Sequence, residues 1–151
     1  MRAELCALIL SLAFGGTAMA AEPVELGPKG GRLLALNPER SGYAEVTSDN
    51  NSFYIELLDR DLKPVVIDQQ TLTAVGGERR APQRLPVETR DNRFVTPVPA
   101  GDEVWMLLQI KPSPGARKFR VRFHHDVTSC PECGKQRWLC ECDAKKSKTE
   151  G

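Results

Sequence analysis

The chain has 151 residues, with 21 basic and 20 acidic side chains and a formal net charge of +1. Hydrophobic residues make up 40% of it, which excludes a disordered polyelectrolyte, and the near-neutral balance argues against a general nucleic-acid binder, whose domain is usually strongly basic. Eleven prolines and 12 glycines are spread along the chain and favour many turns and short strands over helices.

Residues 1–20 have the pattern of a secretory signal peptide. Arg2 precedes an apolar run over residues 5–14, and the stretch ends in the small-residue sequence Ala-Met-Ala. The apolar run is too short to cross a hydrocarbon core, which needs about 20 residues. We therefore expect cleavage after Ala20, removal of Cys6 with the signal, and a periplasmic or secreted protein without stable membrane insertion.

Residues 21–127 are expected to form one β domain, because apolar residues alternate there in short runs that end in turn residues. Phe53, Ile55 and Leu57, for example, share one face of a strand. Residues 103–110 are apolar on both faces, which is typical of a central strand. The expected strands are 33–36, 43–47, 53–58, 65–67, 71–75, 85–89, 94–98, 103–110 and 117–125.

Turn residues separate these runs. Tight turns are expected at Gly76-Gly77 and at Asp91-Asn92. Short strands at spacings of about 8 to 12 residues predict an all-β fold, a small antiparallel β-sandwich that is immunoglobulin-like or cupredoxin-like. In the last strand, alternation directs one set of side chains inward, Phe119, Val121 and Phe123, and another outward, Lys118, Arg120 and Arg122.

The first part of the β domain carries three short motifs. They are the opening Gly-Pro-Lys-Gly-Gly-Arg at 27–32, a strand that bears Glu45, and a strand that ends at Asp59 and is followed by Lys-Pro-Val at 63–65. This pattern resembles a group of small bacterial periplasmic β domains that occur beside heavy-metal efflux systems or at the start of efflux adaptors. The resemblance implies a role in heavy-metal handling, with an envelope efflux protein or another protein as partner.

Every cysteine of the mature chain lies in one short segment. The spacing is C-x2-C, six residues, then C-x-C, formed by Cys130, Cys133, Cys140 and Cys142. The sequence Cys-Pro-x-Cys-Gly resembles the first knuckle of zinc ribbons, in which Pro and Gly bend the backbone so that two thiolates point at one ion. The second pair departs from the C-x-x-C of the ribbons, and C-x-C is more often seen in thiolate clusters for copper or zinc.

Four thiolates at tetrahedral distances suit Zn²⁺ or, as soft ligands, Cu(I). We therefore expect a four-cysteine knuckle over residues 128–143 that binds Zn, with Cu(I) as the alternative. Four thiolates and Zn²⁺ sum to a formal charge of −2, and four basic residues are placed to offset it: Lys135, Arg137, Lys145 and Lys146. Trp138 and Leu139 are expected to cap the site against solvent.

Two other interpretations of the cysteines stay open. In an oxidising compartment clustered cysteines tend to pair, and Cys130–Cys142 with Cys133–Cys140 would staple a hairpin and leave no cofactor. A redox-active C-x-x-C is the third interpretation; it requires a helix after the motif, which Gly134 disfavours.

His124 and His125 end the last expected strand, five residues before the first cysteine of the segment. Alternation directs His125 toward the core and His124 outward. Imidazole is a common metal ligand, so either histidine can supplement or replace a thiolate at the site.

No hydrolase, phosphate-binding or metalloprotease motif occurs, and no enzymatic activity is expected. The arginine-rich stretches 78–93 and 117–122 lack interleaved aromatics for base stacking, and are interpreted as solvent-facing edge-strand arginines rather than as a face for an anionic partner. Residues 144–151 are polar and are expected to form a disordered tail. The sequence thus predicts an exported metal-binding protein, or alternatively a secreted structural or interaction domain with two disulfides and no metal.

Overall fold

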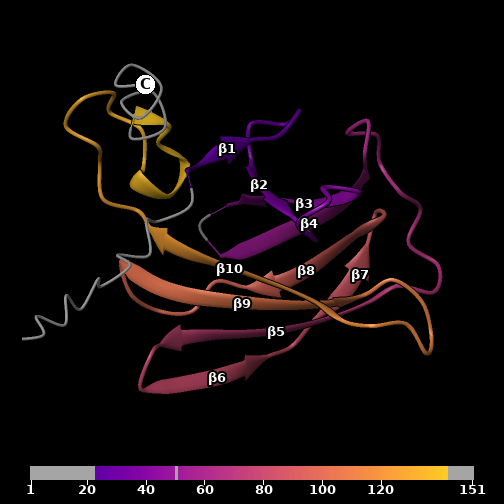
Figure 1. The fold of residues 1–151 in the computed structure, drawn as a ribbon. Coiled ribbons are helices and arrows are strands. Elements are labelled where there is room, and N and C mark those ends of the chain that lie inside the picture. Colours follow the sequence, from indigo (N-terminus) through magenta and orange to yellow (C-terminus); the bar gives the residue numbers. More distant parts are fainter. Residues whose placement is uncertain (1–22, 50, 143–151) are drawn as a thin grey trace, which may run out of the picture.

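Two antiparallel sheets face each other across one apolar core in the computed structural model, which describes residues 23–49 and 51–142 (Figure 1). This arrangement is the small antiparallel β-sandwich expected from the strand pattern. The predicted signal peptide, residues 1–20, and the predicted tail, residues 144–151, lie outside the described residues. None of the helices among the described residues is long and apolar enough to span a membrane.

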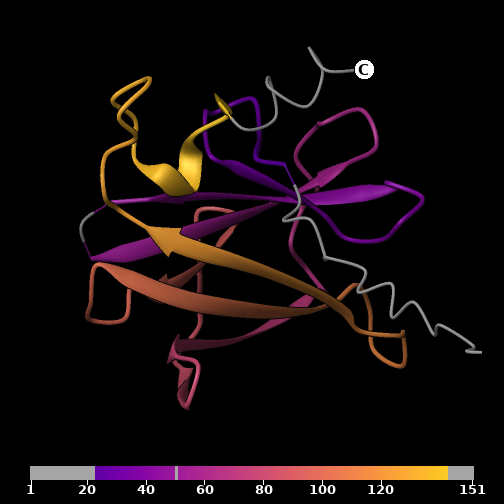
Figure 2. The same cartoon turned by 60° about the vertical axis from the view of Figure 1, so that its left-hand side comes forward.

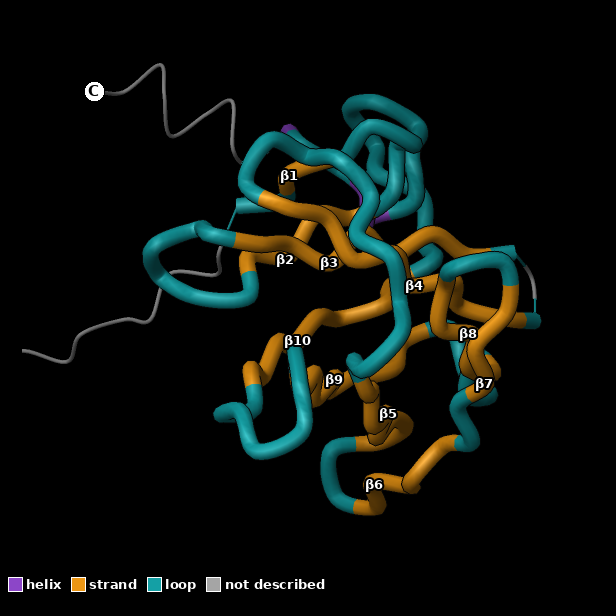
Figure 3. Tube along the Cα trace, turned by 90° about the vertical axis from the view of Figure 1, so that its right-hand side faces the viewer, coloured by secondary structure: helices purple, strands orange, loops and turns teal. Residues whose placement is uncertain are grey.

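The first sheet has six strands in the order β1-β2-β3-β4-β8-β7, and each neighbouring pair is antiparallel. Its strands β1 to β4 form the upper layer in Figure 3, with β8 and β7 continuing it at one side. The bounds are β1 Glu25–Leu26, β2 Arg32–Ala35, β3 Gly42–Ser48, β4 Ser52–Asp59, β7 Glu88–Arg90 and β8 Arg93–Pro97.

The second sheet has four antiparallel strands in the order β10-β9-β5-β6. Strand β9 lies in its interior, as the apolar run 103–110 predicts. The chain crosses between the sheets three times, after β4, after β6 and after β8. The bounds are β5 Thr71–Glu78, β6 Ala81–Leu85, β9 Glu103–Lys111 and β10 Phe119–Asp126.

The core between the sheets is built by strict alternation along the strands. Phe53, Ile55 and Leu57 of β4 all point inward and are at most 4% exposed. On the opposite sheet, the inward positions of β10 are Val121 and Phe123, while Arg120 and Arg122 between and beside them are exposed. Because side chains alternate between the two faces of a strand, every second residue joins the core.

Three details of the strand prediction are wrong. Residues 65–67 form no strand, because pairing with β4 stops at the bridge between Leu58 and Pro64. The side chain of Asn92 instead accepts a hydrogen bond from the amide of Ile67 (2.7 Å) and donates one to the carbonyl of Val65 (3.0 Å). Residues 85–89 are split between β6 and β7, which belong to different sheets; Pro86 lies at the crossing.

The expected turn at Gly76-Gly77 is the third error, because both glycines lie inside β5. A Cβ at Gly76 would overlap the sulfur of Met106, so this glycine serves close packing rather than a turn. The hairpin between β5 and β6 turns instead at residues 79–80. The expected turn at Asp91-Asn92 is present, with φ angles of 51° and 58° that suit a two-residue hairpin turn.

The Gly-Pro-Lys-Gly-Gly loop between β1 and β2 folds over a buried carboxylate. Glu45 of β3 is 1% exposed, and its Oε1 accepts hydrogen bonds from the amides of Lys29 (2.8 Å) and Gly31 (3.1 Å). A Cβ at Gly27 would overlap this carboxylate, and one at Gly31 would overlap the backbone of Val46. Gly27 and Gly31 of the opening motif are therefore required by the close approach of the loop to β3.

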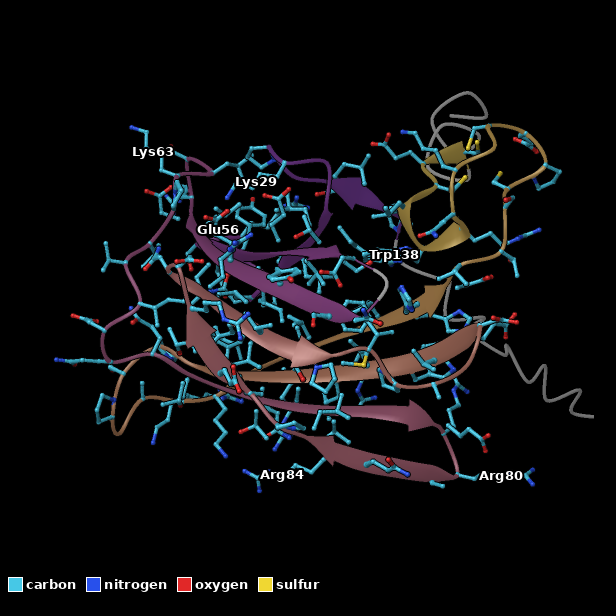
Figure 4. The ribbon with its side chains drawn as sticks, turned by 180° about the vertical axis from the view of Figure 1, so that it is seen from behind. Lys29, Glu56, Lys63, Arg80, Arg84 and Trp138 are labelled. Atoms are coloured by element: carbon cyan, nitrogen blue, oxygen red, sulfur yellow. The ribbon has the colours of Figure 1, made fainter. Side chains whose placement is uncertain are left out.

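A lysine balances the charge of this buried region. Glu56 of β4 lies directly opposite Glu45 in the strand pairing, and its carboxylate contacts the ammonium of Lys29 at 2.8 and 3.0 Å. Lys29 and Glu56 are seen together on the outer side of the first sheet in Figure 4. The loop thus brings two amides and one ammonium to a pair of neighbouring carboxylates.

Replacing Glu45 by Ala removes both hydrogen bonds to the loop, and we expect the free energy of unfolding to fall by about 2 kcal/mol. Urea denaturation followed by circular dichroism measures the change. The control Glu39→Ala removes an exposed carboxylate and is expected to change stability by less than about 0.5 kcal/mol. A Glu45→Ala variant as stable as the parent would contradict this account of the loop.

Candidate metal centre

The sulfur atoms of four cysteines converge on one point beyond the end of β10. The four Sγ atoms of Cys130, Cys133, Cys140 and Cys142 all lie within 4.8 Å of one another. The separations are 4.0 Å for Cys130–Cys142 and 3.5 Å for Cys133–Cys140. A tetrahedral zinc site with Zn–S bonds of about 2.3 Å has its sulfurs about 3.8 Å apart. Four clustered cysteines at these separations can hold a metal ion.

A tight turn brings the first two cysteines together. The carbonyl of Cys130 accepts a hydrogen bond from the amide of Gly134 (2.8 Å), and the amide of Cys130 donates one to the carbonyl of Lys135 (2.8 Å). Gly134 has a φ of 72°, in the left-handed region that glycine adopts without strain. The Gly of the Cys-Pro-x-Cys-Gly motif therefore closes the turn that aims both sulfurs at the same point.

Backbone amides donate to the sulfurs of both cysteine pairs. The amides of Cys133 and Glu132 hydrogen-bond to the sulfur of Cys130. The amide of Cys142 lies 3.5 Å from the sulfur of Cys140 and donates to it in the same way. Amide donors stabilise negative charge on an acceptor, so this backbone is arranged to receive thiolates.

Because of these hydrogen bonds, the thiols of the cluster have different pKa values. The amides of Cys133 and Glu132 lower the pKa of Cys130 to about 7. The pKa of Cys142 is raised, chiefly because its thiol donates a hydrogen bond to the side chain of Cys140. A side-chain hydrogen bond with Cys133 is the next largest cause. For Cys140 the amide of Cys142 acts to lower the pKa, but the side chain of Cys130 and burial outweigh it, and the pKa is raised. Close packing of thiols thus favours one thiolate, and a cation is needed for the rest to ionise together.

One of the expected charge-balancing residues, Lys135, pairs with a carboxylate of the knuckle. The ammonium of Lys135 lies 4.0 Å from the carboxylate of Glu141, so this ion pair joins the two halves of the knuckle. Both side chains reach solvent, and such a pair contributes little to stability. Lys145 and Lys146 lie outside the described residues.

The knuckle is fixed to the sandwich by a tryptophan that enters the core. Trp138 lies in the short 3-10 helix η1 (Arg137–Leu139) and is 2% exposed. Its ring contacts those of Phe53 (6.1 Å between centroids), Phe123 (6.1 Å) and His125 (4.8 Å). Figures 1 and 2 show the knuckle at the end of the sandwich where β10 ends, and Figure 4 shows Trp138 between the knuckle and the strands.

The expectation that Trp138 caps the metal site is therefore corrected, because its ring packs into the sandwich. Leu139 is likewise half-buried against the core. Hydrogen bonds secure the same contact: the Arg32 guanidinium of β2 donates to the carbonyl of Trp138 (3.1 Å), and the amide of Arg137 donates to the carbonyl of Thr128 (2.9 Å). The cysteine segment is thus attached to both sheets.

The two histidines lie elsewhere. His125 points into the core, as alternation predicts, with its ring 4.8 Å from that of Phe53 and neither ring nitrogen hydrogen-bonded within the described part of the chain. Burial lowers its pKa, and nearby His124 lowers it further. His124 points outward and stacks on Trp105 at 4.5 Å. Neither belongs to the group of side chains whose ligand atoms converge.

The cluster is open on one side. Cys130 and Cys140 are buried, Cys142 is half-buried and Cys133 is exposed. Two sulfurs are therefore set against protein and one faces solvent, so a metal ion held here is accessible to a ligand from outside.

Comparison with known proteins adds no relative, since no family model, no curated protein and no solved structure matches the chain. The chemistry of the four cysteines therefore has to be inferred from their own geometry.

The two tryptophans provide a matched test of how the knuckle is attached. Trp138→Ala empties a buried aromatic position, and we expect the free energy of unfolding to fall by about 3–5 kcal/mol. Trp105→Ala removes a partly exposed ring and its contacts with Arg79 and His124, and should lower it by only about 1–2 kcal/mol. Urea denaturation followed by far-ultraviolet circular dichroism compares the two variants. Equal effects would contradict the anchoring role of Trp138.

Proposed function

We propose that this chain is an exported, non-enzymatic metal-binding protein whose knuckle coordinates one Zn²⁺ ion through Cys130, Cys133, Cys140 and Cys142. The observation that carries the proposal is the convergence of four sulfur atoms within 4.8 Å of one another. Function on this proposal is coordination without turnover: the protein binds the ion, and the sandwich presents it in the compartment outside the cytoplasm.

Zinc is preferred over copper because of the number of sulfurs and their separations. Soft thiolate ligands select zinc or Cu(I), and a tetrahedral set of four sulfurs is typical of zinc. The separations of 3.5 and 4.0 Å lie on either side of the value of about 3.8 Å for such a tetrahedron. Cu(I) is the alternative ion, and loading experiments distinguish the two.

The disulfide alternative has less support from the geometry. The nearest sulfur pairs, Cys130–Cys142 and Cys133–Cys140, match a nested pairing, yet a disulfide bond is about 2.05 Å long and both pairs are well beyond it. Amide donors to the sulfurs of Cys130 and Cys140 also favour thiolates over bonded sulfurs. The sulfurs of nested disulfides carry no negative charge that these amide donors could stabilise.

The open side of the knuckle supports a role in heavy-metal handling. Exposed Cys133 allows an incoming thiol or carboxylate to displace one ligand, which is the first step in passing an ion to another protein. We propose an envelope protein, such as a component of an efflux system, as the receiver.

Fractionation of cells that make the tagged protein tests the proposed export. We expect the shorter, cleaved chain to be found outside the cytoplasm.

Metal analysis of the purified protein tests the central proposal. We expect mass spectrometry of protein isolated from its native compartment to find one zinc ion per chain, with four thiols that react with a thiol reagent only after chelation. Four blocked thiols and no metal would establish the disulfide alternative instead. One copper ion per chain, with thiols that do not react before chelation, would show that the bound ion is Cu(I) and not zinc.

Loss of one ligand should disable the site. Cys140→Ser removes a buried sulfur, and we expect the affinity for zinc to fall by a factor of roughly 100 or more, because a neutral hydroxyl replaces a thiolate. Ser129→Ala is the matched control, since Ser129 pairs with Gln136 through its backbone and should bind zinc as the parent does. Competition with a chromophoric chelator measures both. Unchanged affinity in Cys140→Ser would contradict coordination by four sulfurs.

Zinc affinity should depend steeply on pH. Because the pKa values of Cys140 and Cys142 are raised, the metal-free knuckle keeps protons at neutral pH that zinc must displace. The metal-free form thus binds more protons than the zinc form, so affinity falls as pH falls. With at least these two protons displaced we expect at least about a 100-fold loss per pH unit, and a steeper loss below about pH 7, where Cys130 is protonated as well. Chelator competition at several pH values checks the slope, and a pH-independent affinity would contradict thiolate ligation.

A further inference from the structure

The outer face of the second sheet carries side chains that the metal centre does not use. In the strand pairing, Arg84 of β6 lies opposite Val75 of β5, Val75 opposite Leu107 of β9, and Leu107 opposite Arg122 of β10. Paired residues in a sheet point to the same face. One row across four strands therefore has an arginine at each end and two apolar side chains in the middle.

The next row adds an exposed aromatic ring. Trp105 is 37% exposed and is one of two large hydrophobic residues exposed among the described residues. The Arg79 guanidinium lies 4.0 Å from the centre of its ring, and His124 stacks on it. A cavity of about 540 Å³ opens here, lined by residues that include Trp105, Leu107 and Arg122. The face is thus hollowed, apolar at its centre and basic at its margins.

The arginines of this face have no acidic partners. Within the described part of the chain, the exposed residues Arg79, Arg80, Arg84, Arg120 and Arg122 form no ion pair. Figure 4 shows Arg80 at the turn between β5 and β6 and Arg84 near the far end of β6, both projecting away from the first sheet. Arg79 and Arg122 line the apolar hollow, and Arg84 ends the row that crosses it, so the face complements a partner that carries carboxylates.

We propose that this face binds an acidic peptide segment of a partner protein, with an apolar side chain between two carboxylates. Arg84 and Arg122 stand three strand spacings apart, which is about 14 Å. An extended peptide covers the same distance in four residues and points alternate side chains to the same side. The spacing selects the pattern acid-x-apolar-x-acid, with the apolar residue over Val75 and Leu107.

Other anionic partners fit this face less well. The ring of Trp105 already packs against the Arg79 guanidinium and the His124 ring, and both compete with a nucleic-acid base for stacking on it. Two acids belong to this face: Glu78 lines the hollow, and Glu103 lies 3.9 Å from His124. Their negative charges oppose a uniformly anionic surface such as a lipid layer. A peptide places its carboxylates at two points, over the arginines and away from these acids.

Binding of synthetic peptides to the full mature protein tests the proposal. The probe is a fluorescein-labelled peptide with the core Glu-Ser-Leu-Ser-Glu, followed by fluorescence anisotropy. We expect a Kd of roughly 0.1–1 mM at low salt, as for a short flexible ligand. Arg84→Ala and Arg122→Ala should each weaken binding roughly tenfold, as expected for a lost charge-assisted hydrogen bond. Leu107→Asn should weaken it by a similar factor.

Two peptides and one variant serve as controls. A peptide with lysine in place of both glutamates should not bind, and one with adjacent glutamates, Glu-Glu-Leu-Ser-Ser, should bind at least fivefold more weakly. Arg90→Ala removes an exposed arginine of the other sheet and should bind the probe as the parent does.

Three outcomes would overturn the proposal. They are equal binding of the lysine and glutamate peptides, equal loss in Arg90→Ala and Arg84→Ala, and tighter binding to phosphatidylglycerol vesicles that is lost in the same arginine variants. The last would assign the face to a lipid surface. None of these results depends on metal in the knuckle, so they leave the proposed metal function untouched.

Discussion

Burial of one indole ring connects the cysteine knuckle to the β-sandwich. Trp138 fills the space beside Phe53 of the first sheet and Phe123 of the second, so it contacts both layers at the end where β10 leaves the core. Burial of a tryptophan side chain contributes several kcal/mol, far more than the exposed Lys135–Glu141 pair or the turn hydrogen bonds of the knuckle. The position of the four sulfurs relative to the domain therefore depends on this contact.

Such an anchor changes the physical role that a metal ion has in the knuckle. A short cysteine segment without a core of its own depends on the metal to fold. Here the backbone is already held by Trp138, by Arg32 and by the pairing of Ser129 with Gln136, and the amides already point at the sulfurs of Cys130 and Cys140. Less chain entropy has to be lost on binding, which strengthens coordination. The sandwich thus acts as a rigid support for the site.

Local patterns predicted much of this structure, and the failures share a cause. Alternation placed Phe53, Phe123 and His125 inward, and the cysteine spacing identified the four converging residues, because both signals depend only on near neighbours in the chain. The same reasoning assigned Trp138 to the metal site, since a sequence does not show which loop covers the open end of a sandwich. The sequence showed the glycines at 27 and 31 as part of a motif, but not why they are needed. The loop lies against Glu45 and Val46 of β3, and this is a contact between distant residues.

Strand β10 separates the two proposed sites while touching both. Its consecutive residues His124 and His125 point to opposite faces: His125 packs on Trp138 under the knuckle, and His124 stacks on Trp105 at the outer face. The inward side chains of β10 therefore hold the anchor of the knuckle, and its outward side chains form part of the basic face. Because the period of a strand is two residues, each pattern can change without altering the other. A partner bound through the arginines would leave Cys133 and the open side of the knuckle uncovered, so metal binding and protein recognition can occur together on one small domain.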